Sequence, residues 1–172
     1  MRNRLRSSTP EPTTGAAPLP RCSLPEAMDR FFTRTFQLRG RASRSDYWWW
    51  MLVNVVIVAI TQLLIPALIS DRTPQPTLSI GPFGSALFAN IELINVHQTD
   101  APSSPVAAFS LMTAALWLIV TIVPGITIAI RRLHDSNLSG GWVLLALFPP
   151  GAFVLLLLAT RRPRIDGARF DT

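Results

Sequence analysis

The residues best suited to chemistry in this sequence lie in a short charged segment between two apolar runs. In 131-RRLHDSNLSGGW-142, four of the first five residues can carry charge. Arg131 and Arg132 present planar guanidinium groups, which can bind a phosphate through two parallel hydrogen bonds. His134 beside Asp135 is an oriented imidazole that titrates near neutral pH. The segment therefore indicates either anion binding or the anchoring of helix ends.

A second charged group, which contains Arg41, Arg44 and Asp46, directly precedes the first apolar run. Trp48 and Trp142 follow the two charged groups, and indole rings favour the headgroup level of a bilayer. If both groups face one membrane surface, they could together hold an anionic lipid headgroup or a small anion. The candidate binding residues are therefore Arg41, Arg44, Asp46, Arg131, Arg132, His134 and Asp135.

The same residues also suit a purely architectural role, which the sequence favours. Arginines in the last turn of a helix complement the negative end of the helix dipole. Asp135 can pair with Arg131 at i+4 or with Arg132 at i+3, and Asp135 or Asn137 can cap the next helix. The two roles differ at Arg132, where a lysine should still serve as an anchor but binding requires the planar guanidinium.

Catalysis and metal binding are not predicted. Adjacent His134 and Asp135 point in different directions on a helix, and no glycine-framed nucleophile motif surrounds nearby Ser139. His97 and His134 fall on opposite sides of the predicted membrane, and Cys22 lies in a polar tail, so no metal site is expected. No cofactor or nucleic-acid partner is expected, because the dispersed N-terminal arginines serve membrane topology equally well. Transport is a less favoured alternative, because the apolar runs contain no ionisable residue. It would also require oligomers, because a single chain with three spans is small for a pore.

The chain is too apolar for a typical soluble domain, because 49% of its 172 residues are hydrophobic and 15% are charged. Three uncharged runs predict membrane segments at about residues 47–69, 106–130 and 138–160. Each run is long enough, since a crossing helix needs about 20 apolar residues. Core helices of a soluble protein are the disfavoured alternative, because too little polar surface would remain to cover them. The predicted interfacial anchors are Tyr47, Trp48 and Trp142.

The placement of arginines predicts the orientation. Nine arginines and four acids precede residue 47, whereas the outer loop, residues 71–105, contains one arginine and three acids. By the positive-inside bias, the N-terminus and the RRLHD segment face the cytoplasm. The four arginines of residues 161–172 conflict with a full third crossing, and Pro149-Pro150-Gly151 interrupts that run. A re-entrant hairpin and a kinked span are the two alternative paths.

The remaining segments complete an all-α membrane protein, a small helical bundle with about three membrane segments. Residues 1–24 are rich in Pro, Ser and Thr and predict a disordered tail. Residues 25–44 predict an amphipathic helix, introduced by a Ser23–Glu26 capping box, that lies in the membrane interface or packs on other helices. Residues 45–160 form the transmembrane domain with an irregular outer loop, and residues 161–172 form a basic tail.

Two motifs resemble a known family. The segment 36-FQLRGRASRSDYW-48 resembles the F-x-G-R-x-x-R-x-E-[FY]-W opening of the bacterial membrane proteins catalogued as domain of unknown function 805. Leu38-Arg39 lengthens its spacing, and Asp46 replaces the usual Glu. The segment 131-RRLHDSNLSGGW-142 resembles the family's R-R-L-H-D-x-x-x-S-x-W with one additional glycine, and 167-GARFD-171 hints at its tail motif. The resemblance covers about residues 30–165 except the outer loop; it implies a small multi-span inner-membrane protein and no known activity.

The sequence thus predicts a multi-pass protein of the bacterial plasma membrane with a cytoplasmic N-terminus. Its predicted role is architectural or in protein interaction, and the alternative is binding of an anionic lipid headgroup or a small anion. The expected partners are the lipid bilayer, further copies of the chain or other membrane proteins, and anionic lipid.

Overall fold

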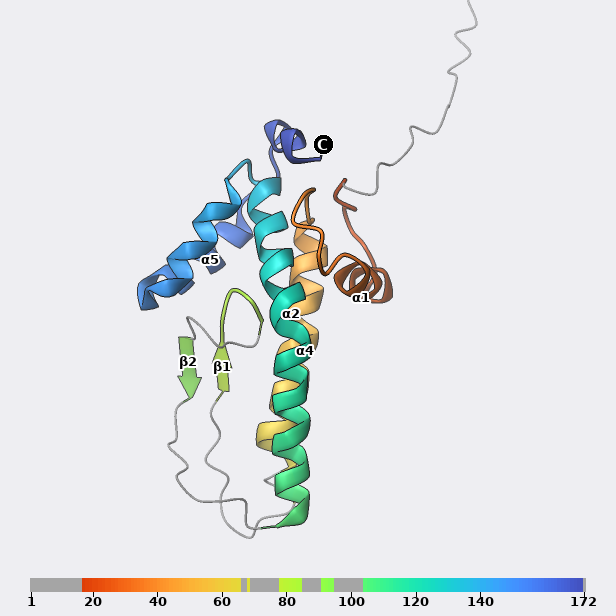
Figure 1. Ribbon diagram of the computed structural model, residues 1–172, viewed down its shortest axis with the longest axis vertical. Helices are drawn as coiled ribbons and strands as arrows, with labels where there is room; N and C mark the ends of the chain where they lie inside the picture. The colour runs from red at the N-terminus through yellow and green to blue at the C-terminus, as the bar shows by residue number, and fades with distance from the viewer. Residues whose placement is uncertain (1–16, 66–67, 69–77, 85–90, 95–103, 172) are drawn as a thin grey trace, which may run out of the picture.

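Two long antiparallel helices form the axis of the molecule (Figure 1). The computed structural model describes residues 17–65, 68, 78–84, 91–94 and 104–171, so the predictions for residues 1–16 and for most of the outer loop lie outside the described residues. Helix α2 (Arg44–Ala59) continues through a π-helical turn, η1 (Ile60–Leu64), and α4 (Pro105–Asp135) runs beside it in the opposite direction.

Buried polar side chains fix the pairing of these two helices. The indole N–H of Trp117 on α4 donates to the side-chain oxygen of Asn54 on α2 at 3.0 Å. At the far end of the pair, the hydroxyl of Ser110 donates to the carbonyl of Thr61 at 2.5 Å. Asn54 is only 1% exposed, so the bond from Trp117 satisfies an amide oxygen that water cannot reach.

Helix α1 (Leu24–Thr33) packs across the start of α2 and is shorter than the predicted helix at 25–44. The Ser23–Glu26 capping box begins it, as expected. The ring of Phe31 is buried and stacks on Trp50 with 3.8 Å between ring centroids. The chain then turns, and a second capping box starts α2, which explains the early end of α1. Packing on other helices is therefore the observed role of α1.

The described residues are mostly helical, but a two-stranded sheet departs from the all-α expectation. Strands β1 (Leu78–Ile80) and β2 (Ile91–Ile94) are antiparallel. The turn that follows β1, residues 81–84, enters the helical core, where the carbonyl of Pro82 accepts a 2.6 Å hydrogen bond from the hydroxyl of Tyr47. Gly84 has a φ of 91° and lies against the ring of Trp50, so no other residue type fits there without strain.

The third apolar run is a hairpin made of a 3-10 helix, η2 (Gly140–Leu147), and helix α5 (Pro149–Thr160). The break lies at Phe148, which is extended (φ −115°, ψ 133°), one residue before the predicted break. The two prolines begin α5 instead of interrupting it. In the first turn of a helix the backbone N–H groups have no partner within the helix, so the missing N–H of proline costs no hydrogen bond. The arms are roughly 16 and 18 Å long at rises of about 2.0 and 1.5 Å per residue.

Both ends of this hairpin lie beside the last turns of α4. Gly140 at the start of η2 contacts His134, and the carbonyl of Ala159 near the end of α5 accepts a hydrogen bond from Arg132. A final 3-10 helix, η3 (Ile165–Phe170), then lies at the same end of the molecule as the end of α4 and the start of α2 (Figure 1). In shape, the segment follows the hairpin alternative rather than the kinked span.

The outer faces of the helices are apolar. Within the described residues, one helix, Ala108–Asp135, is long and apolar enough to cross a membrane by length and composition. Large hydrophobic side chains are exposed along α2 and α4 at helical spacing; they include Leu52, Val56, Ile60, Leu64, Phe109, Met112, Leu116, Ile119 and Val123. An exposed apolar surface of this extent is typical of contact with lipid or with another protein.

Substitution of Gly151 by alanine should destabilise the hairpin, because a Cβ at this position would overlap the backbone carbonyl of Leu145. Backbone cannot move aside as a flexible side chain would, so the expected loss of unfolding free energy is about 1–3 kcal/mol. Gly141→Ala is the matched control, since a Cβ there meets only the hydroxyl of Ser139, at 3.7 Å. Thermal unfolding in one detergent compares them, and equal melting temperatures would contradict the hairpin packing.

Candidate functional site

The structure brings the two predicted charged groups together at one end of the bundle, where α2 begins and α4 ends. The backbone N–H of Ala42 donates to the carbonyl of Arg131 at 3.0 Å, and the guanidinium of Arg131 donates to the carbonyl of Arg41 at 3.1 Å. These reciprocal bonds fasten the segment before α2 to the last turn of α4. The sequence predicted only that the two motifs could share one membrane surface. In the structure the two motifs contact each other directly.

Arg132 is the centre of this charged cluster, although only 1% of it is exposed. Its guanidinium donates to the carboxylate of Asp135, to the carbonyl of Ala159 at 2.8 Å and to the carbonyl of Arg161. The sequence allowed Asp135 to pair with Arg131 or with Arg132, and in the structure it pairs with Arg132. We call this set of contacts the Arg132 clamp, because one side chain joins the end of α4 to the end of α5.

His134 faces the C-terminal segment. Its Nδ1 lies 3.2 Å from the carbonyl of Gly40, and its ring stacks on Phe170 with 4.0 Å between centroids. A carbonyl only accepts, so Nδ1 carries the proton in this contact. The backbone N–H of Gly40, which has a φ of 90°, in turn donates to the carbonyl of Phe170 at 2.6 Å. His134 is thus held between two chain segments that are remote from it in sequence.

Arg41 pairs with the C-terminal end of the chain. Its Nε and Nη2 approach the carboxylate of Asp171 at 2.9 and 2.6 Å, which is a two-pronged contact of the kind that guanidinium groups favour. The backbone N–H of Arg164 also donates to the carbonyl of Asp135 at 2.8 Å. The predicted basic tail is therefore fastened to the cluster by both side chains and backbone.

Asp46 has a capping role inside the cluster. Its carboxylate accepts from the backbone N–H of Ser43 at 3.0 Å and from the thiol of Cys22 at 3.1 Å, and Arg30 of α1 lies at 3.5 Å. The carbonyl of Cys22 accepts from the indole of Trp49. Burial, together with the neighbouring Asp46 carboxylate, raises the pKa of the Cys22 thiol. Residues assigned by sequence to the disordered tail thus contact α2.

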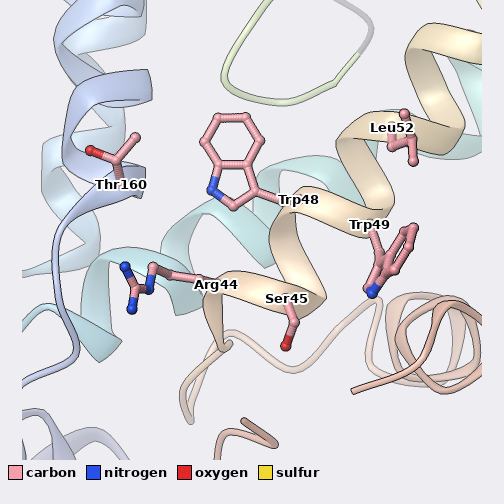
Figure 2. Close-up of a pocket in the computed structure, with 6 residues that line it drawn as sticks. All are labelled: Arg44, Ser45, Trp48, Trp49, Leu52 and Thr160. Atoms are coloured by element: carbon pink, nitrogen blue, oxygen red, sulfur yellow. The ribbon is translucent and has the colours of Figure 1, made fainter. Parts of the chain in front are cut away.

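Arg44 differs from the other members of the cluster because its guanidinium is exposed and makes no hydrogen bond or ion pair within the described residues. It lies at one end of a groove of about 570 Å³. Figure 2 shows Arg44 and Trp48 on the side of α2 that faces Thr160 at the end of α5, and Trp49 and Leu52 on the side that faces away from it. The lining residues are Arg44, Ser45, Trp48, Trp49, Leu52 and Thr160.

The three predicted interfacial anchors occupy different environments. Trp48 and Trp142 are 40% and 47% exposed, as anchors require. Tyr47 is only 1% exposed and bonds to the Pro82 carbonyl, so it is a core residue rather than an anchor. The predicted cap of the next helix is also wrong, because Ser139 caps η2 by accepting from the backbone N–H of Gly141.

Sequence reasoning missed several residues that complete the cluster. Phe170 and Asp171 contact His134 and Arg41, and their only sequence signal was the partial likeness of 167-GARFD-171 to a family tail motif. Arg30 had no signal beyond its place on the polar side of an amphipathic helix. Within the described residues, no group of three or more His, Cys, Asp or Glu side chains is placed to hold a metal ion.

Comparison with known proteins decides the family. A family model described as "Protein of unknown function (DUF805)" matches residues 35–172. The chain belongs to this family. It is also 27% identical over 119 residues, 69% of each protein, to Inner membrane protein YhaI of Escherichia coli (strain K12), and equally so to YhaI of Escherichia coli O157:H7. No solved structure matches the chain significantly.

The DUF805 match contains every residue of the predicted charged cluster and the C-terminal segment that completes it. Helix α1 (Leu24–Thr33) precedes the match. The Arg132 clamp is therefore part of the DUF805 region, whereas Cys22 and Arg30 are supplied by the segment before it.

Arg132→Lys should destabilise the protein even though the positive charge is kept. An ammonium group cannot reach three acceptors arranged around a planar guanidinium, so at least one buried acceptor would lose its donor. The expected loss of unfolding free energy is about 1–3 kcal/mol. Arg162→Lys is the control, since Arg162 is exposed. Thermal unfolding in detergent measures both variants, and a fully stable Arg132→Lys protein would disprove the proposed role of the clamp geometry.

Proposed function

We propose that this DUF805 protein is a multi-pass protein of the bacterial inner membrane and that its charged cluster is architectural. The cluster holds the membrane segments in a fixed arrangement, and their apolar faces then serve contacts with lipid, with further copies or with other membrane proteins. The proposal rests on one observation, which is that the charged side chains of the RRLHD motif bind other groups of the same protein. Arg131, Arg132, His134 and Asp135 all contact other groups of the protein, and each is less than 9% exposed.

The membrane location rests on two observations. The curated relative is an inner membrane protein. The exposed apolar side chains of α2 and α4 would be unfavourable in water, because burial of apolar surface contributes about 25 cal/mol per Å². In our proposal α2 with η1 forms the first membrane segment, α4 the second and the hairpin the third.

The proposed topology places the charged cluster, the N-terminus and the C-terminus in the cytoplasm. The hairpin starts and ends beside the cluster, and its arms of roughly 16–18 Å reach about half of a hydrocarbon core of about 30 Å. A re-entrant third segment also keeps the four arginines of residues 161–172 inside, which removes the conflict with the positive-inside bias.

Fusions of reporters to the C-terminus test this topology. Green fluorescent protein attached after Thr172 should fluoresce, because it folds in the cytoplasm, and alkaline phosphatase at the same position should be inactive. A matched pair of fusions within residues 95–103 of the outer loop should give the opposite result. Active phosphatase at residue 172 would mean that the third run crosses the membrane and would overturn the re-entrant path.

A second candidate function, binding of an anionic phospholipid, is favoured by the groove beside Arg44 (Figure 2). The exposed guanidinium at one end suits a phosphate, and the rings of Trp48 and Trp49 with Leu52 suit an acyl chain. This site uses one residue of the predicted cluster, Arg44. It is compatible with an architectural role for the other members.

Native mass spectrometry of protein released from its own membranes separates the two candidates. The wild type and an Arg162→Gln control should retain anionic phospholipid, whereas Arg44→Gln should retain several-fold less, because one exposed charge contact is lost. Equal retention by all three proteins would remove the groove proposal. A defined mass lost only in a folded His134→Ala variant would instead assign binding to the buried cluster and contradict its architectural role.

A further inference from the structure

Three arginines from two helices gather where α1 packs against α2 and α4. Arg30 and Arg34 lie one helical turn apart along α1 and the turn after it, and Arg131 lies on the last turns of α4. The hydroxyl of Thr127 donates to the carbonyl of Thr35 at 2.7 Å, which fastens the end of α1 to α4 one turn before Arg131. This bond brings Arg34 and Arg131 to the same level of the bundle.

Negative charge near these arginines is insufficient to balance them. Arg131 is subject to repulsion from Arg34 and Arg30, and the attractive charges that act on it are Asp46 and Asp171. Asp171 is already paired with Arg41 at 2.6 Å.

Asp46 lies 3.5 Å from Arg30, but its oxygens also serve the capping box and Cys22. Burial and then the charge of Arg30 lower the pKa of the Arg34 guanidinium, and the charges of Asp46 and Asp29 oppose this shift. Asp29 also attracts Arg34, so the three guanidinium groups share two carboxylates, Asp29 and Asp46, and positive charge at this junction exceeds negative charge.

Each of the three side chains also has a buried nitrogen without a hydrogen-bond partner. These atoms are Nη1 of Arg34, Nε of Arg131 and Nε of Arg30, and the last of them lies 3.5 Å from the Asp46 carboxylate in an ion pair that is too long for a good hydrogen bond. Arg131 is only 4% exposed, so water has little access to it. An unpaired buried donor is costly, and a charged one more so. Three such donors in one cluster point to a missing acceptor with several oxygens and negative charge.

We propose that Arg30, Arg34 and Arg131 bind one phosphate group, as inorganic phosphate or as the phosphomonoester of a lipid headgroup. A phosphate dianion offers several acceptor oxygens and about two negative charges, which match the excess positive charge at this junction. Arg30 and Arg34 are only partly buried, so the group can enter from the surface. The site is distinct from the groove beside Arg44 and does not depend on the architectural role of the Arg132 clamp.

The two sources of phosphate have different consequences. A headgroup would join α1 to the bilayer at the start of the bundle, whereas inorganic phosphate would make the packing of α1 depend on a soluble ligand. In either case the segment that precedes the DUF805 match supplies two of the three ligands, Arg30 in α1 and Arg34 directly after it. The site is thus a property of this chain's N-terminal helix combined with the RRLHD motif.

Thermal unfolding of the full chain in nanodiscs tests the proposal. The probes are inorganic phosphate, with sodium chloride at equal ionic strength as reference, and phosphatidic acid against phosphatidylcholine as the nanodisc lipid. The key variant is Arg34→Gln, because this side chain makes no hydrogen bond or ion pair with the part of the chain that the structure describes, so the fold should survive. Arg162→Gln is the matched control, since it removes the same charge from an exposed position. Arg34→Lys is a second variant that keeps the charge if the glutamine protein unfolds.

The wild type and Arg162→Gln should gain thermal stability with phosphate or with phosphatidic acid, and Arg34→Gln should bind about tenfold more weakly or worse. Stabilisation by phosphate identifies the soluble ligand, and stabilisation by phosphatidic acid alone identifies the headgroup; both support the site. The proposal is overturned if chloride stabilises as well as phosphate while the two lipids are equivalent. It is equally overturned if Arg34→Gln and Arg162→Gln respond alike.

Discussion

The arrangement of α4 and α5 depends on the buried guanidinium of Arg132. A buried ion pair contributes little by itself, because the cost of removing both charges from water offsets their attraction. In this protein the pair with Asp135 uses only part of the guanidinium, and its other N–H groups bind the carbonyls of Ala159 and Arg161. The carbonyl groups at the end of α5 can accept hydrogen bonds from this guanidinium only if α5 returns to the end of α4. The hairpin therefore follows from the need to provide hydrogen-bond acceptors for one buried charge.

The same constraint explains the position of the C-terminal segment. Once α5 ends beside Arg132, the chain is close enough for η3 to place Phe170 against His134 and Asp171 against Arg41. Those contacts cover the cluster and exclude water from it, which strengthens the hydrogen bonds inside. They also show why Arg is required at position 132 for an architectural role. An anchor that needs only charge would accept lysine, but a group that must reach separate acceptors in one plane would not.

The sequence predicted the features that arise from local chemistry. The Ser23–Glu26 capping box, the i+3 pairing open to Asp135 and the break near Pro149 are all readable from spacing. It did not predict the features that depend on distant contacts. The burial of Tyr47 and the docking of Asp171 each require a partner 35 or 130 residues away, and neither leaves a periodic pattern. The seven candidate site residues lie at one end of the bundle, where Arg44 is exposed and the other six contact groups of the protein.

Two irregular backbone segments, the turn at residues 81–84 and the tip of the hairpin, must satisfy their backbone groups among apolar side chains. The turn at residues 81–84 does so partly through its own paired glycines, Gly81 and Gly84, and partly through the hydroxyl of Tyr47. Near the tip of the hairpin, Phe148 donates to the carbonyl of Leu145 at 3.1 Å. Tyr47, one turn from the start of α2, supplies a donor to the turn at residues 81–84, and Arg132, one turn from the end of α4, supplies donors to the carbonyls at the end of α5. The charged groups at the ends of α2 and α4 and the hydrogen bonds to irregular backbone are thus parts of one arrangement.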